Sequence, residues 1–387
     1  MKENNDITAI RQLFLPFDNK VFPVRNRFVR SATWLGVCDE ATGRITDLAV
    51  SRQAEAAAGG AGVVISEFAY VSREGRAAPR QWGLDSDEAV ADVRLLAEAV
   101  HRAGSKLVVQ ICHAGAAKLA GNETDALALS PSGEPYPGAS CTSAAMSEEE
   151  IKKVTEEFAK AAARVKEGGA DGVEIHGAHG YLLTQFMSPL LNKRTDAYGG
   201  SDENRSRFMR EVCLAVRRAV GPEFSVWLKI SAEEGTPGGY GACEGVKAAL
   251  SMIEAGVEVI EVSSGTSYSE AHRSPSMVGV SAGDSEAPFA EYAKAIRDKA
   301  PKDSLVVLTG GLRSLPVIAA LFTAGDADLF GLSRPFIAEP DLINRWAEED
   351  SRPSACFSCN ACSRTAATGA VTCPIMRDKH EGDWDPL

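Results

Sequence analysis

Two histidines and a tyrosine stand close together in the segment His176-Gly177-Ala178-His179-Gly180-Tyr181. Imidazole and phenol groups can hydrogen-bond to a carbonyl oxygen and can transfer a proton. Because the imidazoles are three residues apart on a glycine-containing turn, they can direct N–H groups at one point. The phenol, two residues further on, can reach a neighbouring atom. The pattern therefore predicts a site that polarises a carbonyl group and delivers a proton beside it.

Two other interpretations of these histidines stay open at this point. A His-x-x-His pair can bind a metal ion, although no glutamate stands at the second position and the spacing is not that of a zinc-protease helix. Both histidines can also be packed core residues with satisfied hydrogen bonds, since histidine is intermediate in burial. The surrounding chain favours catalysis.

Alternating strand and helix patterns indicate the elements that must position this site. Eight apolar runs are predicted as buried strands, and each is followed by a helical pattern. The predicted strands cover residues 26–34, 63–70, 106–113, 172–176, 225–232, 259–264, 305–310 and 328–334. The predicted helices cover residues 47–58, 88–103, 147–167, 203–220, 244–255, 289–299, 315–324 and 341–349. Eight such units favour a closed (β/α)8 TIM barrel over an open doubly wound sheet.

Length and composition fit one large domain with a short extension. Of 387 residues, 44% are hydrophobic and 24% are charged, as in soluble globular proteins. We expect residues 1–350 to form the barrel and residues 351–387 to form a C-terminal extension packed on it. The net charge of −12 argues against nucleic-acid and membrane partners. Nine cysteines and a polar N-terminus without a signal peptide indicate a reducing, cytoplasmic setting.

Polar residues at the ends of the predicted strands indicate a bound cofactor, because active sites of such barrels lie at the C-terminal strand ends. The segments Gly310-Gly311 and Ser333-Arg334 precede helices, where backbone N–H groups can hold a phosphate. Lys229 can stabilise negative charge, with an ordinary ion-paired lysine as the alternative. Gln110 can hydrogen-bond the edge of a flat heterocycle. A ligand with one phosphate and a redox-active ring is implied, and FMN fits.

Five segments carry a more specific signal. They are NRFVRSAT (26–33), VQICHAG (109–115), HGAHGYLL (176–183), QFMSP (185–189) and NKRTDAYGGSDENR (192–205). Together they resemble the Old Yellow Enzyme family of FMN oxidoreductases over roughly residues 13–373. The resemblance implies a ping-pong reaction. NAD(P)H reduces FMN and leaves, and a small-molecule enone or enoate then takes hydride at its β-carbon.

The resemblance also implies a role for each matching residue. Tyr181 is expected to donate a proton, and His176 and His179 to bind the substrate carbonyl. Residues expected to bind FMN are Ala32, Thr33, Gln110, Lys229, Gly310, Gly311, Ser333 and Arg334. Further residues expected at the substrate are Trp34 and Tyr70. Trp34 stands where better-known members have a small threonine or cysteine.

Four cysteines follow the last predicted helix, and proline follows the last of them. Cys356, Cys359, Cys362 and Cys373 have the spacing Cys-x2-Cys-x2-Cys-x10-Cys. This pattern predicts a [4Fe–4S] ligand set, with structural zinc and unliganded thiols as alternatives. It is similar to the cluster loop of the family branch that contains trimethylamine dehydrogenase and 2,4-dienoyl-CoA reductase. In that branch a second flavin and nucleotide domain follows, so a cluster here implies an external electron donor.

The prediction is thus an FMN-dependent ene-reductase driven by NAD(P)H or by an external electron donor. One alternative is an amine dehydrogenase or demethylase of the trimethylamine type. Another is a flavin-binding electron carrier that is linked to a cluster. The paired histidines favour the ene-reductase, because an amine has no carbonyl oxygen for them to bind. The oligomeric state, including a homo-oligomer, stays open.

Overall fold

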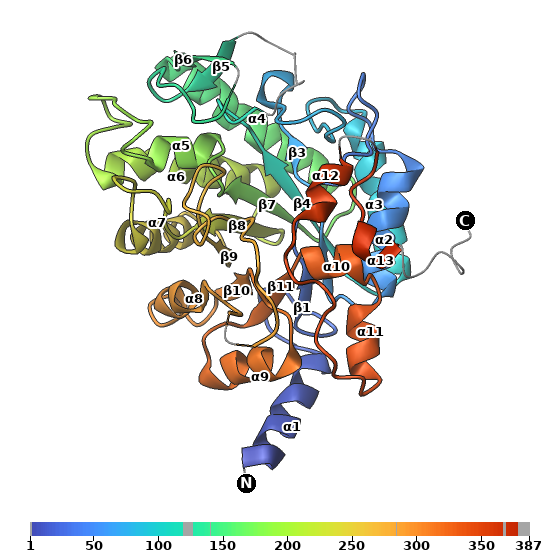
Figure 1. Cartoon of the computed structure of the whole chain (residues 1–387). Coiled ribbons are helices and arrows are strands. Elements are labelled where there is room, and N and C mark those ends of the chain that lie inside the picture. Colours follow the sequence, from blue (N-terminus) through green and yellow to red (C-terminus); the bar gives the residue numbers. More distant parts are fainter. Residues whose placement is uncertain (1, 119–126, 140, 284, 367–368, 378–387) are drawn as a thin grey trace.

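The computed structural model describes residues 2–118, 127–139, 141–283, 285–366 and 369–377. Eight parallel strands form a closed barrel at its centre (Figure 1). They are β1 Phe28–Arg30, β2 Val63–Ile65, β4 Lys106–Cys112, β7 Gly172–Gly177, β8 Ser225–Ser231, β9 Val259–Ser263, β10 Leu305–Thr309 and β11 Leu329–Leu332. The ring closes because β1 pairs with both β2 and β11, while β2 also pairs with β4. The predicted (β/α)8 TIM barrel is confirmed.

Helices surround the barrel and cover its outer face (Figure 1). Those that follow barrel strands are α2 Asp47–Ala58, α3 Ala89–Arg102, α4 Glu148–Glu167, α6 Asp202–Val220, α7 Ala242–Glu254, α8 Ala290–Arg297, α9 Leu315–Ala324 and α11 Leu342–Ala347. Local signals set their ends. Ser147 and Glu150 form a capping box at the start of α4, and Gly325, with φ of +73°, ends α9 in the left-handed conformation.

Three predicted strands are longer than the observed ones by three residues or more. The first predicted strand shrinks to β1, and the second breaks into β2 and β3 Ala69–Tyr70. Glu67 lies at this break, where its carboxylate accepts a hydrogen bond from the backbone N–H of Leu35 (3.2 Å). At the last strand, Arg334 begins α10 Arg334–Ala338. In each case the hydrogen-bond ladder ends just before a serine (Ser31, Ser66 and Ser333), and the sequence pattern overestimates strand length.

Several further elements were not predicted. They are α1 Lys2–Phe14, the 3₁₀ turn Arg73–Gly75, the parallel pair β5 Leu127–Ser130 and β6 Thr142–Ala145, α5 Leu182–Met187, α12 Ala361–Thr365 and α13 Pro374–Arg377. The helix α1 packs against α9 (Figure 1). Most of these elements are too short for hydrophobic periodicity to reveal them.

The described part of the C-terminal extension lies against loops of the barrel. The backbone N–H of Val371 donates to the carbonyl oxygen of Leu35 (2.9 Å), and that of Gly279 donates to Ser358 (3.3 Å). Residues 367–368 and 378–387 of the predicted extension are outside the described residues. The domain boundary at residue 350 therefore stays a prediction. Within the described ranges, no helix is long and apolar enough to cross a membrane.

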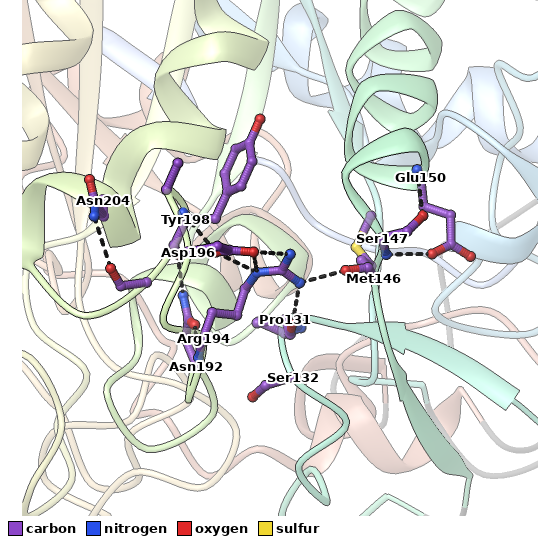
Figure 2. Close-up of polar contacts among 12 residues, drawn as sticks. Pro131, Ser132, Met146, Ser147, Glu150, Asn192, Arg194, Asp196, Tyr198 and Asn204 are labelled. Atoms are coloured by element: carbon purple, nitrogen blue, oxygen red, sulfur yellow. Dashed lines mark hydrogen bonds and ion pairs between the residues drawn. The ribbon is translucent and has the colours of Figure 1, made fainter.

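The segment 192–205 has an evident structural role. Figure 2 shows the guanidinium of Arg194 between the loop after α5 and the chain around β5 and β6. It donates hydrogen bonds to the carbonyl oxygens of Pro131 and Met146 and to the carboxylate of Asp196 (2.6 Å). The segment therefore connects the loop after α5 to the residues that follow β5 and β6.

Replacing Arg194 by methionine is expected to lower the free energy of unfolding by about 3 kcal/mol, because two carbonyl groups and a carboxylate lose a charged donor. Urea denaturation followed by circular dichroism measures this. Arg352→Met is the matched control, since Arg352 pairs with Asp350 at the same two-residue spacing but its side chain is 78% exposed. The control should show no measurable change. Equal losses in the two variants would contradict the structural role of Arg194.

Candidate functional site

The end of β7 and the turn after it bring the two histidines and the tyrosine together. The ring centroids of His176 and His179 are 5.2 Å apart, and those of His176 and Tyr181 are 4.8 Å apart, both edge to face. The turn is anchored where the N–H of Leu182 donates to the carbonyl oxygen of His113 (3.0 Å). The structure thus places all three predicted catalytic residues at one point.

Hydrogen bonds orient both imidazole rings. Nδ1 of His176 accepts from the backbone N–H of Ala178 (3.2 Å), so the neutral ring carries its proton on Nε2. Nε2 of His179 lies 2.9 Å from the hydroxyl oxygen of Ser263, at the end of β9. The backbone of His179 has a left-handed φ of +63°, and its N–H donates to Ser231 (2.9 Å). Both rings are therefore preset before a ligand arrives.

Burial keeps these three side chains electrically neutral. Burial, and then the charge of Lys229, lower the pKa of His176 to about 3. Burial, and then the neighbouring ring of His176, lower the pKa of His179 well below its usual range. Burial raises the pKa of Tyr181 above its ordinary value. Two neutral N–H donors and a protonated phenol are the states that carbonyl binding and proton delivery require.

Acidification is expected to destabilise the fold through His176. The unfolded imidazole takes up a proton near pH 6.5, whereas the native pKa is about 3. Between these values the unfolded state binds more protons, so the free energy of unfolding falls as the pH falls. From pH 7 to pH 5 the loss from this histidine is about 2 kcal/mol. Urea denaturation at both pH values measures it. The same pH dependence in His176→Asn as in the unaltered chain would contradict this assignment.

Two aromatic residues next to the site were missed in the sequence analysis. The ring of Phe68 lies 5.5 Å from that of Tyr181 and 6.2 Å from that of His176. The hydroxyl of Tyr136 touches the turn so closely that a Cβ at Gly180 would lie 2.3 Å from it. Phe68 lies in the break between β2 and β3, and Tyr136 lies in a loop. Phe68 falls inside the predicted strand 63–70 but was not singled out, and the loop that holds Tyr136 has no periodic pattern.

Tyr70, predicted at the substrate, lies elsewhere. Its side chain is fully buried, its hydroxyl accepts from Arg73 (3.1 Å), and its ring fills the space above Gly43 and Gly83. Phe68, in the break between β2 and β3, takes the position facing the histidines. The geometry therefore does not support a substrate contact by Tyr70.

Trp34 lies just after β1 with its indole over Gly36, where a Cβ would be 3.3 Å from the ring. Its Nε1 is buried, and no described group accepts a hydrogen bond from it. Buried indole N–H groups usually have a partner. An unpartnered donor beside the predicted flavin residues Ala32 and Thr33 fits a bound ligand with acceptor atoms.

The residues predicted at the phosphate, Gly310-Gly311 and Ser333-Arg334, lie at the ends of β10 and β11, with Thr33 after β1 beside them. The hydroxyl groups of Thr33 and Ser333 are 2.8 Å apart. Gly310 and Gly311 have φ of +121° and +72°, and a Cβ at Gly310 would lie 2.7 Å from the ring of Phe289. Only glycine fits there. These residues fit the phosphate group of FMN.

Lys229 and Gln110 are both engaged with buried glutamates. The ammonium of Lys229 donates to the hydroxyl of Ser31 (2.8 Å) and to Glu261 (3.0 Å). The amide of Gln110 donates to Glu174 (2.6 Å). Lys229 is thus ion-paired, as the alternative interpretation held, but its side chain is only 4% exposed. An ammonium group has three N–H donors. The hydrogen bonds to Ser31 and Glu261 use two of them, which leaves one for a flavin ring.

Arg334 departs from its predicted place at the phosphate. Its guanidinium donates to the carbonyl oxygen of Met277 (2.8 Å) and to the side chain of Asn360 (2.5 Å). It lines the hollow that also holds the four clustered cysteines. Its two acceptors lie in the loop after β9 and in the C-terminal extension. Only the backbone of Arg334, next to Ser333, therefore stays near Gly310 and Gly311.

The four clustered cysteines, Cys356, Cys359, Cys362 and Cys373, line one hollow. Burial raises the pKa of the Cys362 and Cys373 thiols. In the described parts of the chain, no group of three or more histidine, cysteine or acidic side chains is close enough to hold a metal ion. The predicted metal-ligand set is therefore not confirmed.

The family model and the sequence relatives of this chain point to the same protein family. The model of the NADH:flavin oxidoreductase / NADH oxidase family matches residues 12–352. The NADPH dehydrogenase of Geobacillus sp. (strain WCH70) is 35% identical over 329 residues, which cover 85% of this chain and 91% of that protein. The family match thus includes all eight barrel strands and the turn with the two histidines.

Solved structures share the barrel. A 2-naphthoyl-CoA reductase complex superposes with a TM-score of 0.86 at 24% identity, covering 97% of this chain and 58% of that one. The chain thus spans little more than half of that larger protein. The Old Yellow Enzyme homologue from Zymomonas mobilis superposes with a TM-score of 0.74 at 23% identity, covering 94% of this chain and 98% of that one. At these identities the likeness shows a common fold.

Proposed function

The chain belongs to the NADH:flavin oxidoreductase / NADH oxidase family, so it is an FMN-dependent oxidoreductase, and from this premise we propose that it is an ene-reductase. Its substrate would be an α,β-unsaturated carbonyl compound whose C=C bond is reduced. One observation carries the proposal. Two neutral imidazoles and a protonated phenol meet at one point at the end of β7.

The side chains have distinct roles in this proposal. His176 and His179 donate hydrogen bonds to the carbonyl oxygen, which withdraws electron density from the β-carbon of the substrate. FMN, when bound, supplies the hydride for that carbon. Tyr181 gives its phenolic proton to the α-carbon and recovers a proton from solvent. The rings of Phe68 and Tyr136 close the sides of the site and limit the access of water.

FMN would be held by residues from four sides of the barrel mouth. Gln110 and Lys229 would meet the polar edge of the ring, with Ala32 and Thr33 beside it. The phosphate would rest on the backbone of the Gly310-Gly311 and Ser333-Arg334 segments. We propose NADPH as the electron donor, since the relative at 35% identity is named an NADPH dehydrogenase.

Isotope labelling tests the proposed reaction. The purified flavoprotein would be given NADPH and a cyclic enone in D₂O, and the saturated product analysed by NMR. The proposal predicts deuterium at the α-carbon, from the solvent-exchanged phenol, and hydrogen from the nicotinamide at the β-carbon. No saturated product from any of several enones, together with oxidation of amines, would instead favour the amine dehydrogenase.

We keep a [4Fe–4S] cluster as a proposal, supported by the four cysteines that share one hollow and by their spacing. Anaerobically purified protein should contain about four irons and matching sulfide per chain. Cys359→Ser should lose iron but retain FMN. Cys243→Ser, which removes an exposed free cysteine outside the hollow, is the control and should retain both. Zinc or no metal in the unaltered protein would contradict the cluster.

A further inference from the structure

Two buried glutamates meet in the barrel interior on either side of β8. Glu174 on β7 and Glu261 on β9 are fully buried, and each carboxyl group lies within electrostatic range of the other. Oε1 of Glu174 and Oε2 of Glu261 have no partner among donor groups of the described residues. Two ionised carboxylates are acceptors only. A hydrogen bond that satisfies both unpartnered oxygens would therefore require a proton on one of the two groups.

The surroundings of the two carboxyl groups are unequal. Oε1 of Glu261 accepts from the ammonium of Lys229 (3.0 Å) and from the hydroxyls of Ser31 (2.5 Å) and Thr309 (2.6 Å). Oε2 of Glu174 accepts only from the neutral amide of Gln110 (2.6 Å) among the described donors. Three donors, one of them charged, stabilise negative charge on Glu261, so the shared proton belongs mainly to Glu174.

The other sides of the pair are closed. A Cβ at Gly331, on β11, would lie 1.9 Å from the hydroxyl of Thr309 and 3.4 Å from the carboxylate of Glu261. The nearest further titratable group along β7 is His176, which pairs in register with Lys229 and is neutral. Lys229 is therefore the one described cation that contacts the pair.

We propose that Glu174 and Glu261 share a single proton, present one negative charge to Lys229 and thereby act as a positioning unit for its ammonium. The inference rests on the proposed function in one respect, that Lys229 lies beside the FMN ring. In that position the compensated ammonium stabilises a reduced, negatively charged ring less than a free ammonium would. The pair would thus set the reduction potential of the flavin.

The titration behaviour of the two groups agrees with this arrangement. Burial, and then repulsion by Glu261, raise the pKa of Glu174 well above its usual value. Burial alone would raise the pKa of Glu261 as well. The charge of Lys229 and the hydrogen bonds from Glu174, Ser31 and Thr309 outweigh it, so the pKa of Glu261 is lowered.

Infrared spectroscopy of the purified flavoprotein tests the shared proton directly. A protonated carboxyl absorbs apart from a carboxylate, and the band shifts in D₂O. Both Glu174→Gln and Glu261→Gln should lose the same single carboxylic-acid band, because the glutamate that remains is ionised beside Lys229. Glu254→Gln removes an exposed carboxylate from α7 and should leave the band unchanged. An unchanged acid band in Glu174→Gln would overturn the proposal.

The reduction potential of the bound flavin tests the positioning role. Each single variant keeps one carboxylate for Lys229, so its potential should shift little. The double variant leaves the ammonium uncompensated, and its potential should rise by clearly more than the sum of the single shifts. Additive shifts would mean two independent charges and would overturn the shared proton. A shift in Glu261→Gln as large as in the double variant would do the same.

Failure of this inference and failure of the proposed function give different results. The infrared measurement needs no turnover, and it also decides the matter if the double variant does not retain flavin. A protein that shows the shared proton but reduces no enone would contradict the ene-reductase function and leave the proposal on Glu174 and Glu261 intact. A protein that reduces enones without the acid band would overturn the pair alone.

Discussion

Replacing Tyr181 by phenylalanine should slow the reoxidation of reduced flavin by an enone by about 10²–10⁴-fold, while its reduction by NADPH stays unchanged. Phenylalanine keeps the ring contacts with His176 and Phe68 and removes only the proton donor. The hydride step from NADPH needs no proton from this residue. Anaerobic stopped-flow spectroscopy separates the two half-reactions and measures each rate.

Two other tyrosines serve as controls for this variant. Tyr198→Phe removes a hydroxyl that donates to Glu211 (3.0 Å), and it should leave both half-reactions unchanged. Tyr136→Phe removes a hydroxyl close to the same turn. If Tyr136→Phe abolished reoxidation while Tyr181→Phe retained it, Tyr136 would be the proton donor and the assignment to Tyr181 would be wrong.

Removing the imidazole of His179 should lower kcat/KM for enone reduction by about 10²–10³-fold, the usual cost of one lost oxyanion donor. His179→Ala takes away the N–H group, whereas His179→Asn keeps an amide donor. Asparagine also tolerates the left-handed φ of +63° at this position. Steady-state kinetics with NADPH and an enone, compared among the three proteins, measures the effect.

The two variants distinguish carbonyl binding from packing. If His179 acts as a donor, His179→Asn should retain most of the activity that His179→Ala loses, with flavin content equal in both. Equal losses in the two variants would indicate that the ring packs against His176 and does not bind the substrate. Full activity in both would remove His179 from the site.

The barrel was predictable because its strands are buried on both faces. β10 and β11 consist wholly of buried residues, and apart from Thr309 at the end of β10 each is an apolar run. The site residues on the β7 turn were predictable for a related reason. His176, His179 and Tyr181 lie within six residues, and one turn is enough to bring them together.

Contacts between distant segments were not predictable. The choice between Tyr70 and Phe68 depends on the break between β2 and β3, and the direction of Arg334 depends on Asn360 in the extension. Glu174 and Glu261 are charged residues inside apolar strands, and they were not predicted to meet. Their meeting depends on the strand order β7, β8, β9 and on the register, which the linear pattern does not contain.

The most direct test of the ene-reductase is a single anaerobic experiment on the purified protein. Its flavin would be reduced by one equivalent of NADPH, and a cyclic enone would then be added while the absorption spectrum is recorded. The proposed function predicts that the flavin bands bleach with NADPH and return with the enone, with one saturated ketone formed per flavin. Purified protein without flavin, or reduced flavin that no enone reoxidises, would contradict it.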